Sequence, residues 1–131
     1  MGQQQLLLIV LGVIIVGVAI WVGVAMFSAY SVSSNKQAII LDLQSLEQDI
    51  IAYSRKPRVM GGGGGNMTGY AISSSGPWGA SNGDAGYSIV QQPREILLRG
   101  DSKVVNGAFV LFIIDNTGKV LFGPLSNGFA R

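Results

Sequence analysis

The amino-acid sequence predicts an α+β protein in which one long N-terminal α-helix packs on a small C-terminal antiparallel β-sheet. Residues 1–56 contain no proline, and their apolar residues follow a helical pattern. Residues 57–86 are rich in glycine, serine and asparagine, which is typical of loops. From residue 87 onward, short apolar runs alternate with turn residues, as in antiparallel strands. We therefore expect an N-terminal helix over 1–56 and a globular domain of loop and sheet over 57–131.

The first half of the expected helix is apolar on every side. Its segment 6–27 is 22 residues long, and no charged side chain occurs before Lys36. At about 1.5 Å per residue this segment would reach roughly 33 Å, enough to cross the hydrocarbon core of a bilayer. It is longer and more uniform than the apolar part of a signal peptide, and no basic segment precedes it. We expect it to serve as a membrane segment.

The second half, residues 36–54, is predicted to be amphipathic. Apolar residues recur there at spacings of 4, 3, 4 and 3, which places them on one face of a helix. We expect this face to pack on the sheet: Ile39, Leu43, Leu46, Ile50 and Tyr53. Pro57 is a natural stop for the helix. The polar run 31–35 is its weakest point, where we expect a kink or a melted turn.

Four strands are expected in the C-terminal part, at 87–90, 95–99, 109–114 and 119–122. The sequence 100–102 is predicted to be a turn, and 102–105 to pair as a further short strand. The segment 109–114 is apolar on both faces, which indicates a central strand covered on both sides. The amphipathic face of the helix would supply one cover, and the loop region or a neighbouring subunit the other. We expect four side chains to hold the loop region down: Tyr70, Ile72, Trp78 and Tyr87.

Composition argues against catalysis and against metal or cofactor binding. The chain has no cysteine and no histidine, so the commonest ligands of zinc, copper and haem and the usual acid–base residue are missing. Asp42 and Asp49 lie seven apart and are interpreted as a solvated helix face rather than as an acid–base pair. Gly61–Gly65 follows a helix and lacks the lysine of a phosphate-binding loop, so it is interpreted as a turn. We expect no enzyme activity, no cofactor and no small-molecule substrate.

Charge also argues against nucleic acid as the main partner. The net charge is +2, and the nine basic residues are scattered rather than gathered in a stripe.

Small residues in the apolar segment predict close packing between helices. Ala19 and Gly23 are four apart, as are Ala25 and Ala29, and this spacing lets two helices approach closely. The alternative is a simple anchor with incidental glycines, which are common in membrane helices. We favour self-association through the small residues Gly12, Gly17, Ala19, Gly23, Ala25 and Ala29.

One further motif concerns modification. Asn66-Met67-Thr68 matches the acceptor sequence for N-glycosylation and lies in the expected loop region. Asn66 is therefore a candidate glycosylation site, with a chance match of three residues as the alternative.

The layout of the whole chain resembles the type IV pilin superfamily. The resemblance rests on the apolar segment 6–27, the amphipathic helix 36–53, the loop 57–86 and the sheet 87–123. It implies a homo-oligomeric helical filament on the cell surface, with the N-terminal helices bundled inside and the sheet domains outside. Before assembly, such a subunit resides in the cytoplasmic membrane. The family serves adhesion, motility, DNA uptake and secretion.

The N-terminal motif departs from that of bacterial family members, which have a glycine before the cleavage site and a glutamate at the fifth mature position. If Gly2 precedes the cut, the fifth mature residue is Leu7, and no glutamate occurs before Glu47. Two alternatives therefore stay open. One is a single-span membrane protein with a small extracytoplasmic domain, and the other is a minor pseudopilin of a secretion system.

Overall fold

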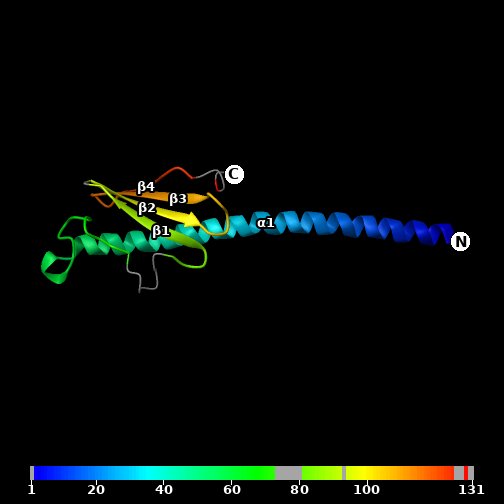
Figure 1. Cartoon of the computed structure of the whole chain (residues 1–131), viewed down its shortest axis with the longest axis horizontal. Coiled ribbons are helices and arrows are strands. Elements are labelled where there is room, and N and C mark those ends of the chain that lie inside the picture. Colours follow the sequence, from blue (N-terminus) through cyan, green and yellow to red (C-terminus); the bar gives the residue numbers. More distant parts are fainter. Residues whose placement is uncertain (1, 73–80, 93, 126–128, 130–131) are drawn as a thin grey trace. The chain divides into compact units, whose positions relative to one another are not determined.

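The structure is a computed structural model that describes residues 2–72, 81–92, 94–125 and 129. It contains one long helix, α1 (Gly2–Arg55), a short 3-10 helix, η1 (Arg58–Met60), and a sheet. The strands are β1 (Ala85–Gln91), β2 (Glu95–Ser102), β3 (Phe109–Asp115) and β4 (Val120–Phe122) (Figure 1). The α+β fold predicted from the sequence is thereby confirmed. Trp78, which we expected to hold the loop region down, lies outside the described residues.

The chain divides into two compact units, Met1–Val32 and Ser33–Arg131. The described part of the first unit is helix throughout. The second unit contains the rest of α1, the loop region and all four strands. The division falls within α1, just before Asn35, the first residue of the helix to be buried.

Helix α1 is uninterrupted between residues 31 and 35, so the melted turn predicted there is wrong. Serine and asparagine weaken helices when their side chains bond to their own backbone. The side chain of Asn35 instead bonds to residues far along the chain. Its Nδ2 donates to the carbonyl oxygen of Asp84 at 3.2 Å, and its Oδ1 accepts from Ser102 Oγ at 2.6 Å.

The four strands form one antiparallel sheet in the order β1-β2-β3-β4, which places β3 inside the sheet. The turn predicted at 100–102 is wrong, since Gly100 pairs with both Tyr87 and Val110 inside the sheet. A Cβ atom on Gly100 would lie 2.7 Å from Cγ2 of Ile39, so this glycine marks a close approach of helix and sheet. The chain turns later, and Gly107 has the positive φ of 77° there. Residues 103–105 lie outside the strands, so the expected extra strand at 102–105 is wrong beyond Ser102.

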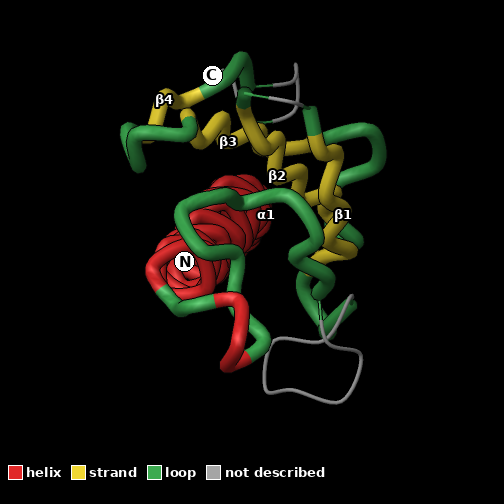
Figure 2. The backbone as a smooth tube through the Cα atoms, turned by 90° about the vertical axis from the view of Figure 1, so that its left-hand side faces the viewer, coloured by secondary structure: helices red, strands yellow, loops and turns green. Residues whose placement is uncertain are grey.

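The core lies between α1 and the inner face of the sheet (Figure 2). Cross-strand neighbours Ile96 and Ile114, and likewise Leu98 and Phe112, are buried on this face. The helix contributes Ile39, Leu43, Leu46 and Ile50, each at most 1% exposed. Burying such a side chain stabilises the fold by roughly 1.5–3 kcal/mol. Packing on this one face therefore holds the helix against the sheet.

The outer face of the sheet is apolar as well. Val90, Leu97, Ile113 and Leu121 are direct cross-strand neighbours and form one row across all four strands. Val90 and Leu121, at the two ends of the row, are 54% and 51% exposed, while Leu97 and Ile113 are half-buried. Strand β3 is thus covered fully on its inner face and in part on its outer face. That a neighbouring subunit covers the rest of the outer face of β3 stays a prediction.

The glycine run after the helix is an ordered cap. Three of its amides donate to carbonyl oxygens at the end of the helix: Gly63 to Tyr53 (2.9 Å), Gly64 to Lys56 (2.9 Å) and Gly65 to Ser54 (2.7 Å). Positive φ angles at Gly61, Gly64 and Gly65 let the chain fold back in this way. The run therefore satisfies carbonyl groups that a helix end leaves without partners.

Candidate functional site

The first unit presents an apolar helix surface. Between Leu6 and Phe27, seventeen large apolar side chains are exposed, from 42% at Val22 to 76% at Phe27. The most apolar window of α1 has a mean hydropathy of 3.0, and none of that window is buried. Length and composition are those of a membrane-crossing helix, and they suggest membrane association or a signal-like segment.

The small residues of this helix do not all share one face. A helix turns about 100° per residue, so residues 7 and 4 apart lie close to one line. Gly12, Ala19 and Gly23 follow this spacing and form a narrow stripe of small side chains. Ala25 and Ala29 pair on a different side, and Gly17 lies on neither line. A Cβ atom placed on Gly12, Gly17 or Gly23 would have nothing within 4 Å beyond the helix's own backbone, and the three alanines are exposed.

In the second unit, four residues of the predicted packing face lie in the core: Ile39, Leu43, Leu46 and Ile50. Tyr53, the fifth residue of this face, is half-buried beside the loop region. Its ring meets that of Tyr70 edge to face, with 5.6 Å between centroids and 70° between planes. Tyr70 thus holds the loop region on the helix, as expected for it.

Asn35 is a structural residue that the sequence analysis missed. It is 5% exposed, and its amide links Asp84 to Ser102 as described above. The signal was its spacing, because Asn35 lies four residues before Ile39 and so extends the packing face by one turn. A polar residue at such a position must be hydrogen-bonded, since burying an unpaired amide is costly.

Asp42 and Asp49 are bound to tyrosines rather than freely solvated. The hydroxyl of Tyr87 donates to Asp42 and that of Tyr70 to Asp49, and Asn82 Nδ2 donates to Asp42 at 2.7 Å. Burial, together with the hydrogen bond and the charge of the carboxylate, raises the pKa of both tyrosines far above the ordinary value. The two carboxylates therefore anchor the loop and β1 to α1.

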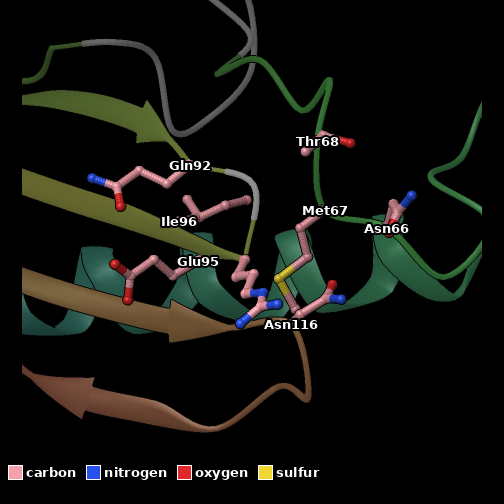
Figure 3. A pocket seen from close by; sticks show the side chains of 8 residues that line it. Asn66, Met67, Thr68, Gln92, Glu95, Ile96 and Asn116 are labelled. Carbon is pink, nitrogen blue, oxygen red and sulfur yellow. The ribbon is translucent and has the colours of Figure 1, made fainter.

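Hollows in the described part of the second unit are small or open. One hollow lies between the loop at Asn66–Thr68 and the strand ends near Ile96 and Asn116 (Figure 3). Its volume of about 10 Å³ is that of a single water molecule. Two larger depressions beside the helix end are open to solvent. Asn66 and Thr68 lie exposed at the edge of the small hollow.

Acidic residues do not cluster in the part of the chain that the structure describes. Across residues 2–72, 81–92, 94–125 and 129, no group of three or more histidine, cysteine, aspartate or glutamate residues could hold a metal ion.

Comparisons with known proteins assign this chain to no family. No family model matches the chain, and searches of curated proteins and of solved structures find no match. The candidate site is the exposed apolar surface of residues 6–27.

Proposed function

We propose that the protein is a structural subunit of an extracellular helical filament similar to a type IV pilus, assembled through its apolar N-terminal helices. The observation that supports this most strongly is the exposed, uncharged surface of α1 from Leu6 to Phe27, joined without a break to the helix of a folded unit. The subunit is a homo-oligomer that acts without enzyme activity or a cofactor. It resides in the cytoplasmic membrane before assembly and on the cell surface afterwards.

The energy of exposing this helix to water explains why it needs a covering. Seventeen large apolar side chains are exposed between Leu6 and Phe27. At roughly 1.5 kcal/mol each, removing them from water is worth on the order of 25 kcal/mol, more than the 5–15 kcal/mol that stabilise a typical domain. Lipid can cover the helix before assembly. In the filament, the same surface of other copies takes the place of lipid.

The stripe of Gly12, Ala19 and Gly23 supports packing between copies. Between lipid and another helix there is little hydrophobic gain, so association depends on close contact. Small side chains permit that contact, and beyond the helix's own backbone nothing lies within 4 Å of a Cβ placed on Gly12 or Gly23.

The competing function is a single-span membrane protein, with lipid as the lasting cover of residues 6–27. The hydropathy and length of the helix favour it equally. Electron microscopy of material sheared from cells that make the protein separates the two readings. Fibres composed of this chain support the proposal, whereas a detergent-solubilised monomer with no fibres under any expression level refutes it.

A substitution in the stripe tests the packing between helices. Gly23→Leu should abolish fibres while leaving membrane insertion intact, because leucine is more apolar than glycine but holds two helices apart. Val24→Leu is the matched control, since it adds bulk on a different side of the helix. Fibre yield by microscopy and membrane fractionation are the two measurements. Normal fibres from Gly23→Leu would contradict the role of the stripe.

A further inference from the structure

We propose that Asn66 is the acceptor of an N-linked glycan on the exported subunit. This inference rests on the proposed function only in requiring that the second unit reach the extracytoplasmic side of the membrane. The co-reactant is an oligosaccharide linked to a lipid phosphate, used by a membrane-bound transferase of the host.

The exposure of the three acceptor residues alternates. Asn66 and Thr68 are exposed, whereas Met67 between them is 5% exposed. The buried Met67 side chain thus separates two residues whose side chains are both open to solvent. Figure 3 shows the Met67 side chain extending from the loop toward Asn116, into the hollow between the loop and the strand ends. A transferase needs access to the amide and to the hydroxyl two residues on, and both residues are exposed in this loop.

The loop that holds the acceptor is fixed on both sides. Before it, the amide of Asn66 donates to the carbonyl oxygen of Gly63 at 3.2 Å, within the glycine cap of the helix. After it, the amide of Gly69 donates to Oε1 of Gln91 at 3.1 Å. Met67 anchors the middle by burial. Removing or modifying the Asn66 side chain therefore leaves the loop's own contacts in place.

The Asn66 side chain is free to react. Among the described residues, its amide group makes no hydrogen bond; only its backbone atoms do. The surrounding surface is polar, since Gln92, Arg94 and Asn116 lie exposed beside the same hollow. A sugar attached here would meet hydrogen-bonding groups and would displace no core residue.

Asn66 Nδ2 forms a bond to the anomeric carbon of the first sugar, and the bond from that carbon to the lipid phosphate oxygen breaks. The phosphate oxygen keeps the electron pair of the broken bond. Nδ2 loses one proton to solvent, and no oxidant or reductant takes part.

Mass spectrometry of the full chain, isolated from the surface of the cells that naturally make it, tests the proposal. The tryptic peptide 59–94 contains Asn66, and we expect it to carry added hexose-type mass. Asn66→Gln and Thr68→Ala should each remove that mass entirely, whereas Thr68→Ser should retain it. Asn116→Gln is the matched control. Asn116 has glycine, not serine or threonine, two residues later, so it does not match the acceptor sequence. Asn116→Gln should leave the mass of peptide 59–94 unchanged.

An unmodified wild-type peptide, or added mass that persists in Asn66→Gln, overturns the inference. The two proposals fail separately. Fibres with an unmodified Asn66 refute the glycan alone, and a glycosylated protein that never forms fibres refutes the filament alone.

Discussion

Replacing Asn35 by alanine should destabilise the second unit by a moderate amount that the structure allows us to work out. The substitution removes two hydrogen bonds, to the carbonyl of Asp84 and from Ser102 Oγ. Each is worth about 1 kcal/mol. Both partners retain another bond, because the Asp84 carbonyl also accepts from the Lys103 amide at 3.0 Å and Ser102 Oγ from the Val105 amide at 3.0 Å. No partner is left wholly unpaired, so the loss stays near 2 kcal/mol.

Alanine recovers part of this loss. Its helix propensity exceeds that of asparagine by roughly 0.6 kcal/mol, which leaves a net cost of about 1.5 kcal/mol. For a folded unit of about 100 residues this corresponds to a fall in melting temperature of roughly 6–12 °C. Near-ultraviolet circular dichroism of the full chain in detergent follows the melting of the folded unit through the packing of its tyrosines, among them Tyr53, Tyr70 and Tyr87.

Ser34→Ala is the matched control, since Ser34 is exposed on the same turn of the helix. It should shift the melting temperature little or slightly upward. In a double-mutant cycle, Asn35→Ala and Ser102→Ala should show a coupling energy of about 0.5 kcal/mol or more. Equal melting temperatures for Asn35→Ala and Ser34→Ala would show that the buried amide contributes nothing, and the reasoning would be wrong.

Two other perturbations probe the same unit. Gly100→Ala should cost about 1–3 kcal/mol in unfolding experiments, because its Cβ would lie 2.7 Å from Cγ2 of Ile39, whereas Gly86→Ala, which has open space, should be nearly neutral; equal effects would contradict the close approach. The pKa of Tyr87 and that of Tyr70 are raised, so the folded state holds their protons more tightly than the unfolded state does. Their contribution to the free energy of unfolding is complete below pH about 10 and is lost as the pH rises above it. Melting temperatures at about pH 8 and about pH 11 should differ less in Tyr87→Phe than in the wild type, and an unchanged difference would refute the assignment.

The elements with a clear period were predictable from the sequence. The helix and the four strands follow from the spacing of apolar residues, because a one-sided core requires side chains every 3.6 or every 2 residues. The packing face of α1 is the best instance, since Ile39 through Ile50 repeat at a spacing that no strand would give.

Features that depend on one contact between distant segments were not predictable. Gly100 is followed by Asp101 and Ser102, and these residue types are typical of turns. Only the close approach of Ile39 explains why a glycine lies inside a strand. The spacing of Asn35 from Ile39 places it on the packing face, but only its hydrogen bonds to Asp84 and Ser102 explain why a polar residue is stable there. Local propensity is a weak prior, and tertiary contacts overrode it at both positions.

The candidate site was predictable in outline only. A long apolar segment without charged residues is recognisable from sequence alone, so residues 6–27 were predictable as a site. Which of the small residues line up could be worked out only once the helix was known to run unbroken through them. What covers the segment involves other molecules, so a single chain does not contain the answer.

The glycine cap has a thermodynamic consequence for the end of α1. Ordering a glycine costs more backbone entropy than ordering any other residue, and here five in succession are fixed with no side chain of their own to bury. Backbone hydrogen bonds alone offset that cost, and each yields only about 1 kcal/mol. We therefore expect the last turn of the helix to open more readily than the residues packed on the sheet, a difference that hydrogen exchange would measure.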